Sequence, residues 1–221
     1  MSLITFEDIK NNKEFKTYIE IGDKHLGIKG YTKHDFGHVT KVAETAGGIL
    51  ENLGFSKREV ELAKIAAYIH DIGNMVNRQE HAQTGACICF DILTRLGMEP
   101  EEIAIIVSSV GNHDEEVGSP INPVSAALIL ADKTDVRRSR VRNTDFATFD
   151  IHDRVNYAVE KAEVKVDGVN RCIDLVLTID TSICPLMEYF EIFLARMLLS
   201  RKAADFLNAK FNLIMNGTKM L

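Results

Sequence analysis

Apolar residues recur at helical spacing along the first two-thirds of the chain. Val42, Ala46, Ile49 and Leu53 follow one another at intervals of three or four residues, and the pattern stops at Gly54. This spacing is typical of the buried face of an amphipathic helix. Glycines and prolines separate such segments by short connections, which favour antiparallel neighbours in a helical bundle. The helices that the pattern predicts are residues 8–20, 38–53, 57–70, 81–96, 100–111 and 123–140.

A strand pattern replaces the helical one after about residue 143. Val164 and Val166 alternate with polar residues, Asp167-Gly168 is a hairpin turn signal, and apolar residues alternate again between 173 and 179. A hairpin alone is only marginally stable in water, so its apolar face has to pack on another element. The helices predicted to cover it or follow it are residues 185–199 and 202–215.

These two patterns predict a mainly α protein. We expect a helical bundle in residues 1–145 and a small C-terminal α+β extension, a two-stranded hairpin plus helices, in residues 146–221. The 185–199 helix is unusually apolar, which leaves two alternatives for it. It forms a homodimer contact, or it packs on the bundle.

Composition narrows the class of protein. The 221 residues are enough to bury one sizeable core. The 26 Lys and Arg against 32 Asp and Glu give a net charge of −6, which argues against a protein that coats nucleic acid. Charged residues arrive at once from Glu7, and no apolar run reaches membrane-spanning length, so we expect neither a secretory segment nor a membrane anchor. The four cysteines lack paired spacing, and a cytoplasmic location is expected.

Candidate chemistry begins at the end of the predicted 57–70 helix, where His70-Asp71-Ile72-Gly73 follows an apolar run. A carboxylate is expensive to bury without a partner, so Asp71 requires a cation or several hydrogen-bond donors. The His-Asp pair alone would be explained equally well by helix capping. Further ligands at compatible positions decide between these interpretations.

Such ligands occur at the ends or on the buried faces of other predicted helices. His38 opens one helix and His81 another, His113 follows the apolar segment 103–110, and Asp132 shares a helix face with Leu128. Nitrogen and oxygen ligands without thiolates suit iron, manganese, zinc, nickel or magnesium rather than copper(I) or an iron–sulfur cluster. The candidate ligands are His38, His70, Asp71, His81, His113 and Asp132.

The order His38, His70-Asp71, Asp132 resembles the HD superfamily of metal-dependent phosphohydrolases, and His70-Asp71-Ile72-Gly73 is similar to the HDIG form of its signature. The motifs span residues 31–142. One departure is Asn74, which stands where some two-metal members carry a lysine.

His81 and His113 resemble the additional histidines of the two-metal branch of this superfamily, although His81 follows His70 more closely than in the HD-GYP phosphodiesterases. The alternative for each is a helix-end histidine that faces water. The resemblance implies one or two divalent metals per chain, with iron, manganese, nickel, cobalt, zinc and magnesium as candidates, and Asp71 bridging a pair.

The reaction that the resemblance implies is hydrolysis of a phosphomonoester or phosphodiester, on a nucleotide or a related small phosphorylated metabolite, by attack of metal-bound hydroxide. The stretch from Lys33 to His38 is similar to one in cyclic-nucleotide phosphodiesterases, where the first histidine protonates the leaving oxygen. His34 is the corresponding residue here, and Asp71 is assigned to catalysis with it. The alternative for His34 is a solvated histidine in the first helical turn.

A basic cluster starts directly after Asp132. Lys133 and Arg137 are the nearest of its residues, and we expect them to bind the substrate phosphate, because guanidinium groups match phosphate oxygens in pairs. The alternative is a solvated charged face. His152-Asp153 is a second His-Asp pair, which we interpret as structural.

Two other functions remain open from the sequence. Some two-iron proteins with an equivalent ligand set resemble oxygenases. A nucleotide-sensing HD domain without turnover would instead pass its signal through the C-terminal extension.

Overall fold

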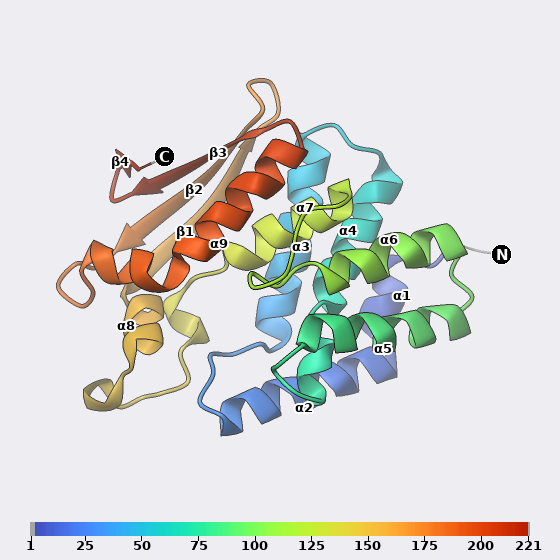
Figure 1. Cartoon of the computed structure of the whole chain (residues 1–221), viewed down its shortest axis with the longest axis horizontal. Helices are drawn as coiled ribbons and strands as arrows, with labels where there is room; N and C mark the ends of the chain where they lie inside the picture. The colour runs from blue at the N-terminus through green and yellow to red at the C-terminus, as the bar shows by residue number, and fades with distance from the viewer. Residues whose placement is uncertain (1–2, 221) are drawn as a thin grey trace.

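The computed structural model describes residues 3–220, and in this range the chain folds into a helical bundle with a small sheet at its C-terminal side (Figure 1). The bundle consists of α1 (Phe6–Asn11), α2 (Lys13–Ile28), α3 (Phe36–Asn52), α4 (Lys57–Ile69), the 3₁₀ helix η1 (Ile72–Met75), α5 (His81–Arg95), α6 (Pro100–Gly111) and α7 (Pro123–Lys133). After it come η2 (Arg138–Arg140), η3 (Phe146–Thr148), α8 (Ile151–Ala158), β1 (Val159–Asp167), β2 (Cys172–Ile179), α9 (Leu186–Phe206), β3 (Lys210–Met215) and β4 (Thr218–Lys219).

The fold class predicted from the sequence is confirmed, and so are several helix starts. Ser56 and Asn122 each accept a backbone hydrogen bond at the start of α4 and α7 in a complete capping box. Pro123 is the first residue of α7, where its missing N–H costs nothing.

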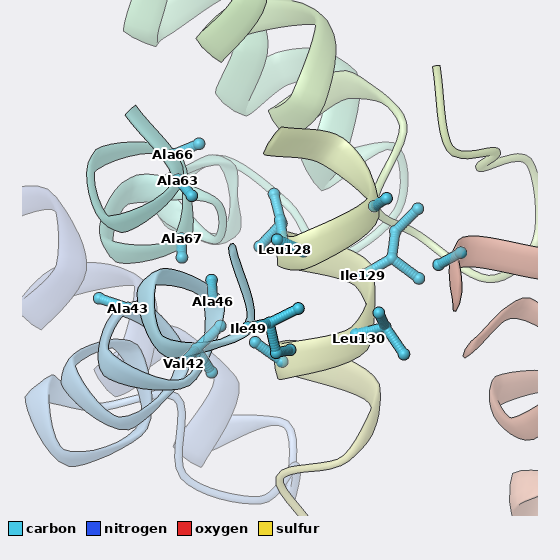
Figure 2. Packing of buried hydrophobic residues seen from close by; sticks show 14 of the residues in the cluster. Val42, Ala43, Ala46, Ile49, Ala63, Ala66, Ala67, Leu128, Ile129 and Leu130 are labelled. Atoms are coloured by element: carbon cyan, nitrogen blue, oxygen red, sulfur yellow. The ribbon is translucent and has the colours of Figure 1, made fainter. Parts of the chain in front are cut away.

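Helix α7 forms the centre of the hydrophobic core. Residues 124–131 are all buried, because α7 packs against α3, α4 and α6 on one side and against α9 on another. Figure 2 shows Leu128 on the side of α3 and α4, while Ile129 lies on the opposite side of the helix. Small residues such as Ala46 and Ala67 let α3 and α4 approach one another closely.

The C-terminal part contains a four-stranded sheet with the order β1-β2-β3-β4. The predicted hairpin corresponds to β1 and β2, which pair antiparallel with Asp167 opposite Cys172. The prediction of only two strands is wrong, since β3 pairs parallel with β2 after the crossover helix α9, and β4 pairs antiparallel with β3. The sheet can therefore bury Ile173, Leu175 and Leu177 completely.

The predicted helix at 202–215 is wrong. Its first residues belong to α9, which ends at Phe206, and Asn208 then adopts a positive φ of 53°. Phe211, Leu213 and Met215 are buried in β3 as alternate residues of a strand. Asn216 and Gly217, both with positive φ, form the tight turn between β3 and β4.

Two other predicted helices also differ from the structure. The 8–20 segment is divided at Asn12, which caps the start of α2. The 123–140 helix ends at Lys133, and the hydroxyl of Thr134 donates to the carbonyl oxygens of Leu130 and Ala131 in its last turn. Helix α8 was not predicted.

Helix α9, which corresponds to the predicted 185–199 helix, packs on α7 and β3. This agrees with the alternative in which the segment packs on the bundle. Its outer face still exposes Met187, Leu194 and Leu198, so the homodimer stays a prediction. Buried residues of both predicted parts belong to one core cluster that runs from Ile9 to Met215, and the division at residue 145 also stays a prediction.

Within residues 3–220, no helix is long and apolar enough to cross a membrane.

Candidate metal centre

The structure brings together all six candidate ligands. His38 lies in the first turn of α3, His70 and Asp71 follow α4, His81 opens α5, His113 follows α6, and Asp132 lies near the end of α7. The four imidazoles are between 0% and 3% exposed, and Asp71 is 7% exposed. The ligands therefore form one buried cluster at the ends of five helices.

A first group of donor atoms surrounds one oxygen of Asp71. The Oδ2 atom of Asp71 lies 3.7 Å from His38 Nε2 and 3.2 Å from His70 Nε2. Asp132 Oδ1 lies 3.4 Å and 3.6 Å from the same two nitrogens. Neither Nε2 has a hydrogen-bond partner among the described residues, although both are buried. Unpartnered buried nitrogens are rare, and these two point at two carboxylates.

A second group of donor atoms surrounds the other oxygen of Asp71. The Oδ1 atom lies 3.4 Å from His81 Nε2 and 3.9 Å from His113 Nε2. The two Nε2 atoms are 3.1 Å apart. Nitrogens bound at right angles to one cation, each at about 2.1 Å, would be separated by about 3 Å.

The tautomers of the four imidazoles follow from their Nδ1 partners. His70, His81 and His113 donate from Nδ1 to the carbonyl oxygens of Ala67, Arg78 and Val110, at 2.7, 3.0 and 2.6 Å. His38 donates from Nδ1 to Asp135 Oδ2 at 2.7 Å. In its neutral form each ring therefore directs the Nε2 lone pair into the cluster, which is how metal-binding histidines are supported.

The pKa shifts of the cluster residues also indicate a cation site. Burial opposes a charge on His70, but the carboxylates of Asp71 and Asp132 raise its pKa to about 10. Burial lowers the pKa of His113 well below its usual value and also lowers that of His81. Although burial opposes ionisation, nearby imidazoles and Lys133 hold the pKa of Asp71 and Asp132 well below their usual range. The cluster thus combines the ionised carboxylates of Asp71 and Asp132 with a positive charge on His70. A divalent cation fits this donor set.

Gly73 allows the two histidine-bearing segments to approach each other. A Cβ atom at this position would lie 2.0 Å from the carbonyl oxygen of His81 and 2.7 Å from the nitrogen of Gly85. Any side chain would push η1 away from α5 and separate Asp71 from His81. The glycine of the His-Asp-Ile-Gly motif is therefore required by packing.

His34 reaches the same cluster from the loop before α3, because Asp35 caps that helix and His34 precedes it. Its Nδ1 donates to Thr32 O at 2.7 Å, and its Nε2 lies 3.9 Å from Asp71 Oδ2. His34 thus lies outside the helix, and the centre of its ring is 5.4 Å from that of His38. Burial lowers the pKa of His34 well below its usual value.

The two basic residues expected to bind phosphate have protein partners in the structure. Lys133 is buried and lies 2.7 Å from Asp132 Oδ2 and 2.6 Å from Glu115 Oε2. Arg137 donates to Asp135 and to the carbonyl oxygen of Gly37. Neither side chain lines the cleft that leads to the cluster.

This cleft has a volume of about 1080 Å³ and receives residues from both parts of the chain. His34 and His81 lie in its wall, together with Arg78 from the connection before α5 and Arg196 from α9. Neither arginine could be identified from the sequence, since each is flanked by residues of other types. Helix α8 and its cap add further polar residues, which are Asp150, His152, Asp153 and Asn156.

Comparisons with known proteins show what this chain is similar to. Residues 35–137 match the family model of the HD domain. An uncharacterized protein of Methanocaldococcus jannaschii is 24% identical over 208 aligned residues, in a match that covers 83% of this chain and 80% of that protein. The crystal structure of a predicted HD superfamily hydrolase from an uncultured Thermotogales bacterium covers 57% of this chain and 68% of its own, with 22% identity and a TM-score of 0.46.

Proposed function

We propose that this chain, an HD-superfamily protein whose residues 35–137 form the HD domain, is a metal-dependent phosphohydrolase that acts on a small phosphoester. The observation that carries this proposal is the position of Asp71, whose two oxygens face two separate pairs of buried imidazole nitrogens. A single carboxylate placed in this way is suited to bridge two cations.

The ligands would divide into two sets that share Asp71. His38, His70 and Asp71 would hold one cation together with Asp132, whose Oδ1 faces the same two imidazoles, and Asp71, His81 and His113 would hold a second. Iron, manganese, nickel, cobalt, zinc and magnesium are all compatible with nitrogen and oxygen donors. When bound, such cations lower the pKa of a coordinated water and polarise phosphoryl oxygens.

Residues of the cleft would then act on the organic part and the leaving group of the substrate. A volume of about 1080 Å³ exceeds what a phosphoryl group needs, so a nucleotide or a metabolite of similar size fits. Arg78 and Arg196 line the cleft and are better placed for phosphate oxygens than Lys133 and Arg137.

His34 is the proposed general acid for the leaving oxygen. This role requires a proton on Nε2, whereas burial in the free protein lowers the pKa of the ring. A phosphoryl anion in the cleft would raise that pKa again, because a nearby negative charge favours the imidazolium form.

The proposal is tested with metal-free protein that is reconstituted separately with Mn²⁺, Fe²⁺, Ni²⁺, Co²⁺, Zn²⁺ and Mg²⁺ and offered a panel of phosphomonoesters and phosphodiesters. Release of phosphate or of the alcohol with at least one metal is the expected result. Oxygen consumption with Fe²⁺ but no phosphoester turnover would identify an oxygenase instead. Tight binding of a nucleotide without turnover under every metal would identify a sensor.

A further inference from the structure

Arg78 lies directly beside the second group of donor atoms. Its Nη1 is 3.3 Å from His81 Nε2 and 3.9 Å from Asp71 Oδ1. The side chain is 25% exposed and lines the cleft. Arg78 also fixes His81 from the other side, because its carbonyl oxygen accepts the hydrogen bond from His81 Nδ1 at 3.0 Å. Backbone and side chain of one residue thus contact both nitrogens of the same imidazole.

The donor group needs a positive partner. His81 and His113 both donate from Nδ1 to carbonyl oxygens, so in their neutral form their Nε2 lone pairs face each other at 3.1 Å. Asp71 Oδ1 adds a negative charge at 3.4 Å from His81 Nε2. The Arg78 guanidinium supplies an N–H donor to His81 Nε2 and a positive charge near Asp71. It therefore provides part of what a cation would provide at this place.

We propose that Arg78 and a second divalent cation compete for this donor group. The lone pair of His81 Nε2 can accept from Arg78 or coordinate a cation, but it cannot do both at once. A guanidinium and a divalent cation beside the same carboxylate oxygen also repel each other. Cation binding at His81, His113 and Asp71 therefore displaces the Arg78 side chain into the cleft.

The cleft can receive the displaced side chain. Arg78 is already partly exposed there, and its guanidinium carbon lies 5.9 Å from the centre of the Tyr31 ring. In the displaced position the guanidinium is free to pair with phosphate oxygens of a substrate. This last consequence rests on the proposed function, whereas the competition itself requires no hydrolysis.

The competition is measured by isothermal titration of the metal-free, full-length chain with Mn²⁺. Arg78→Ala and Arg78→Met remove the guanidinium and retain the backbone carbonyl that orients His81. Lys29→Ala is the matched control, since Lys29 lines the same cleft but donates to Asn77, outside the donor group. Loss of a hydrogen bond from a charged group corresponds to about ten- to hundredfold in affinity. Both Arg78 variants should bind the second Mn²⁺ tighter by about this factor, with the first unchanged.

An unchanged or weaker second Mn²⁺ site in both Arg78 variants would overturn the competition. Equal tightening in Lys29→Ala would overturn it too, because the effect would then come from the general charge of the cleft. A parent protein that binds a single Mn²⁺ at saturation would also refute it, while a single-metal phosphohydrolase would survive. Conversely, two bound Mn²⁺ with the expected variant effects and no phosphoester turnover would support the competition and count against the proposed function.

Discussion

His34 joins the cluster from a loop, with its Nε2 at 3.9 Å from Asp71 Oδ2 and 12% of its side chain exposed to the cleft. If His34 donates a proton to the leaving oxygen, His34→Asn should retain its metals and lose about 10²–10⁴-fold in turnover of an ester with a basic alkoxide leaving group. The loss should be much smaller for a p-nitrophenyl phosphoester, because the phenolate leaves without a proton. The measurement is the ratio of the two rates in parent and variant.

Equal losses on both esters would mean that His34 positions the phosphate or supports the fold. Loss of metal from the variant would place His34 among the ligands.

Asp135 supports the cluster without facing its donor atoms. It accepts the Nδ1 hydrogen bond of His38 at 2.7 Å and also binds Arg137. Partners of this kind typically contribute 10- to 100-fold to metal affinity, so Asp135→Asn should weaken metal binding by about that factor. Competition with a chelator measures the affinity, with the exposed Asp145→Asn as a control. Unchanged affinity would show that His38 is oriented by packing alone.

Among single residues, the sequence revealed the candidate ligands but not the residues that orient them. His38, His70 and Asp71 stand at helix ends in a recognisable order, so their convergence could be predicted. Arg78 and Asp135 act through contacts with His81 and His38, which only the tertiary structure defines. Arg78 has no spacing pattern from which its contact could be derived, and the position of Asp135 three residues after Asp132 does not identify His38 as its partner.

Several elements are joined by a chain of charges that leads away from the cluster. Lys133 of α7 lies between Asp132 and Glu115, and Glu115, in the loop after α6, also pairs with Arg196 of α9 at 3.0 Å. Burial opposes ionisation of Glu115, but Lys133 and Arg196 lower its pKa to about 2. The ionised form of Glu115 therefore stabilises the contact between the helical bundle and α9.

Glu115→Gln should lower the free energy of unfolding by about 1.5–3 kcal/mol at neutral pH, the usual contribution of a hydrogen bond to a charged group. Because the folded pKa lies below the ordinary value of 4.5, this contribution is complete above about pH 4.5 and is lost as the pH falls toward 2. Urea unfolding at several pH values should show the difference between parent and variant shrinking in acid. A constant difference, or an equal loss in the exposed neighbour Glu116→Gln, would contradict this role.

Element boundaries were predictable where local signals are strong. Ser56, Asn122 and Pro123 mark helix starts that the structure confirms. The apolar spacing did not predict the end of α7 at Lys133. It also did not predict β3, which forms by pairing with the edge of β2. The apolar spacing of residues 210–215 fits a helix turn and a strand almost equally well, and pairing with β2 decides between them.

The cleft is larger than the cluster because both the helical bundle and the C-terminal part line it. Helix α7 contacts other helices of the bundle as well as α9, so the C-terminal part is held against the bundle, and α8 lines the cleft. His152 and Asp153, interpreted from the sequence as structural, both line this cleft. Their position could not be predicted, because it results from contacts of α8 with η2 and α9 that only the tertiary structure defines.

If Asp71 joins two cation sites, the number of metal ions per chain should show both of them. Protein purified without chelator, saturated with metal and freed of excess should hold about two divalent ions per chain. Asp71→Ala should hold none and lose phosphoester hydrolysis while keeping its helical circular dichroism spectrum. Asp153→Ala, which removes a carboxylate from the same cleft outside the cluster, should keep both ions. Full metal content and activity in Asp71→Ala would show that Asp71 is not the shared ligand of two cations.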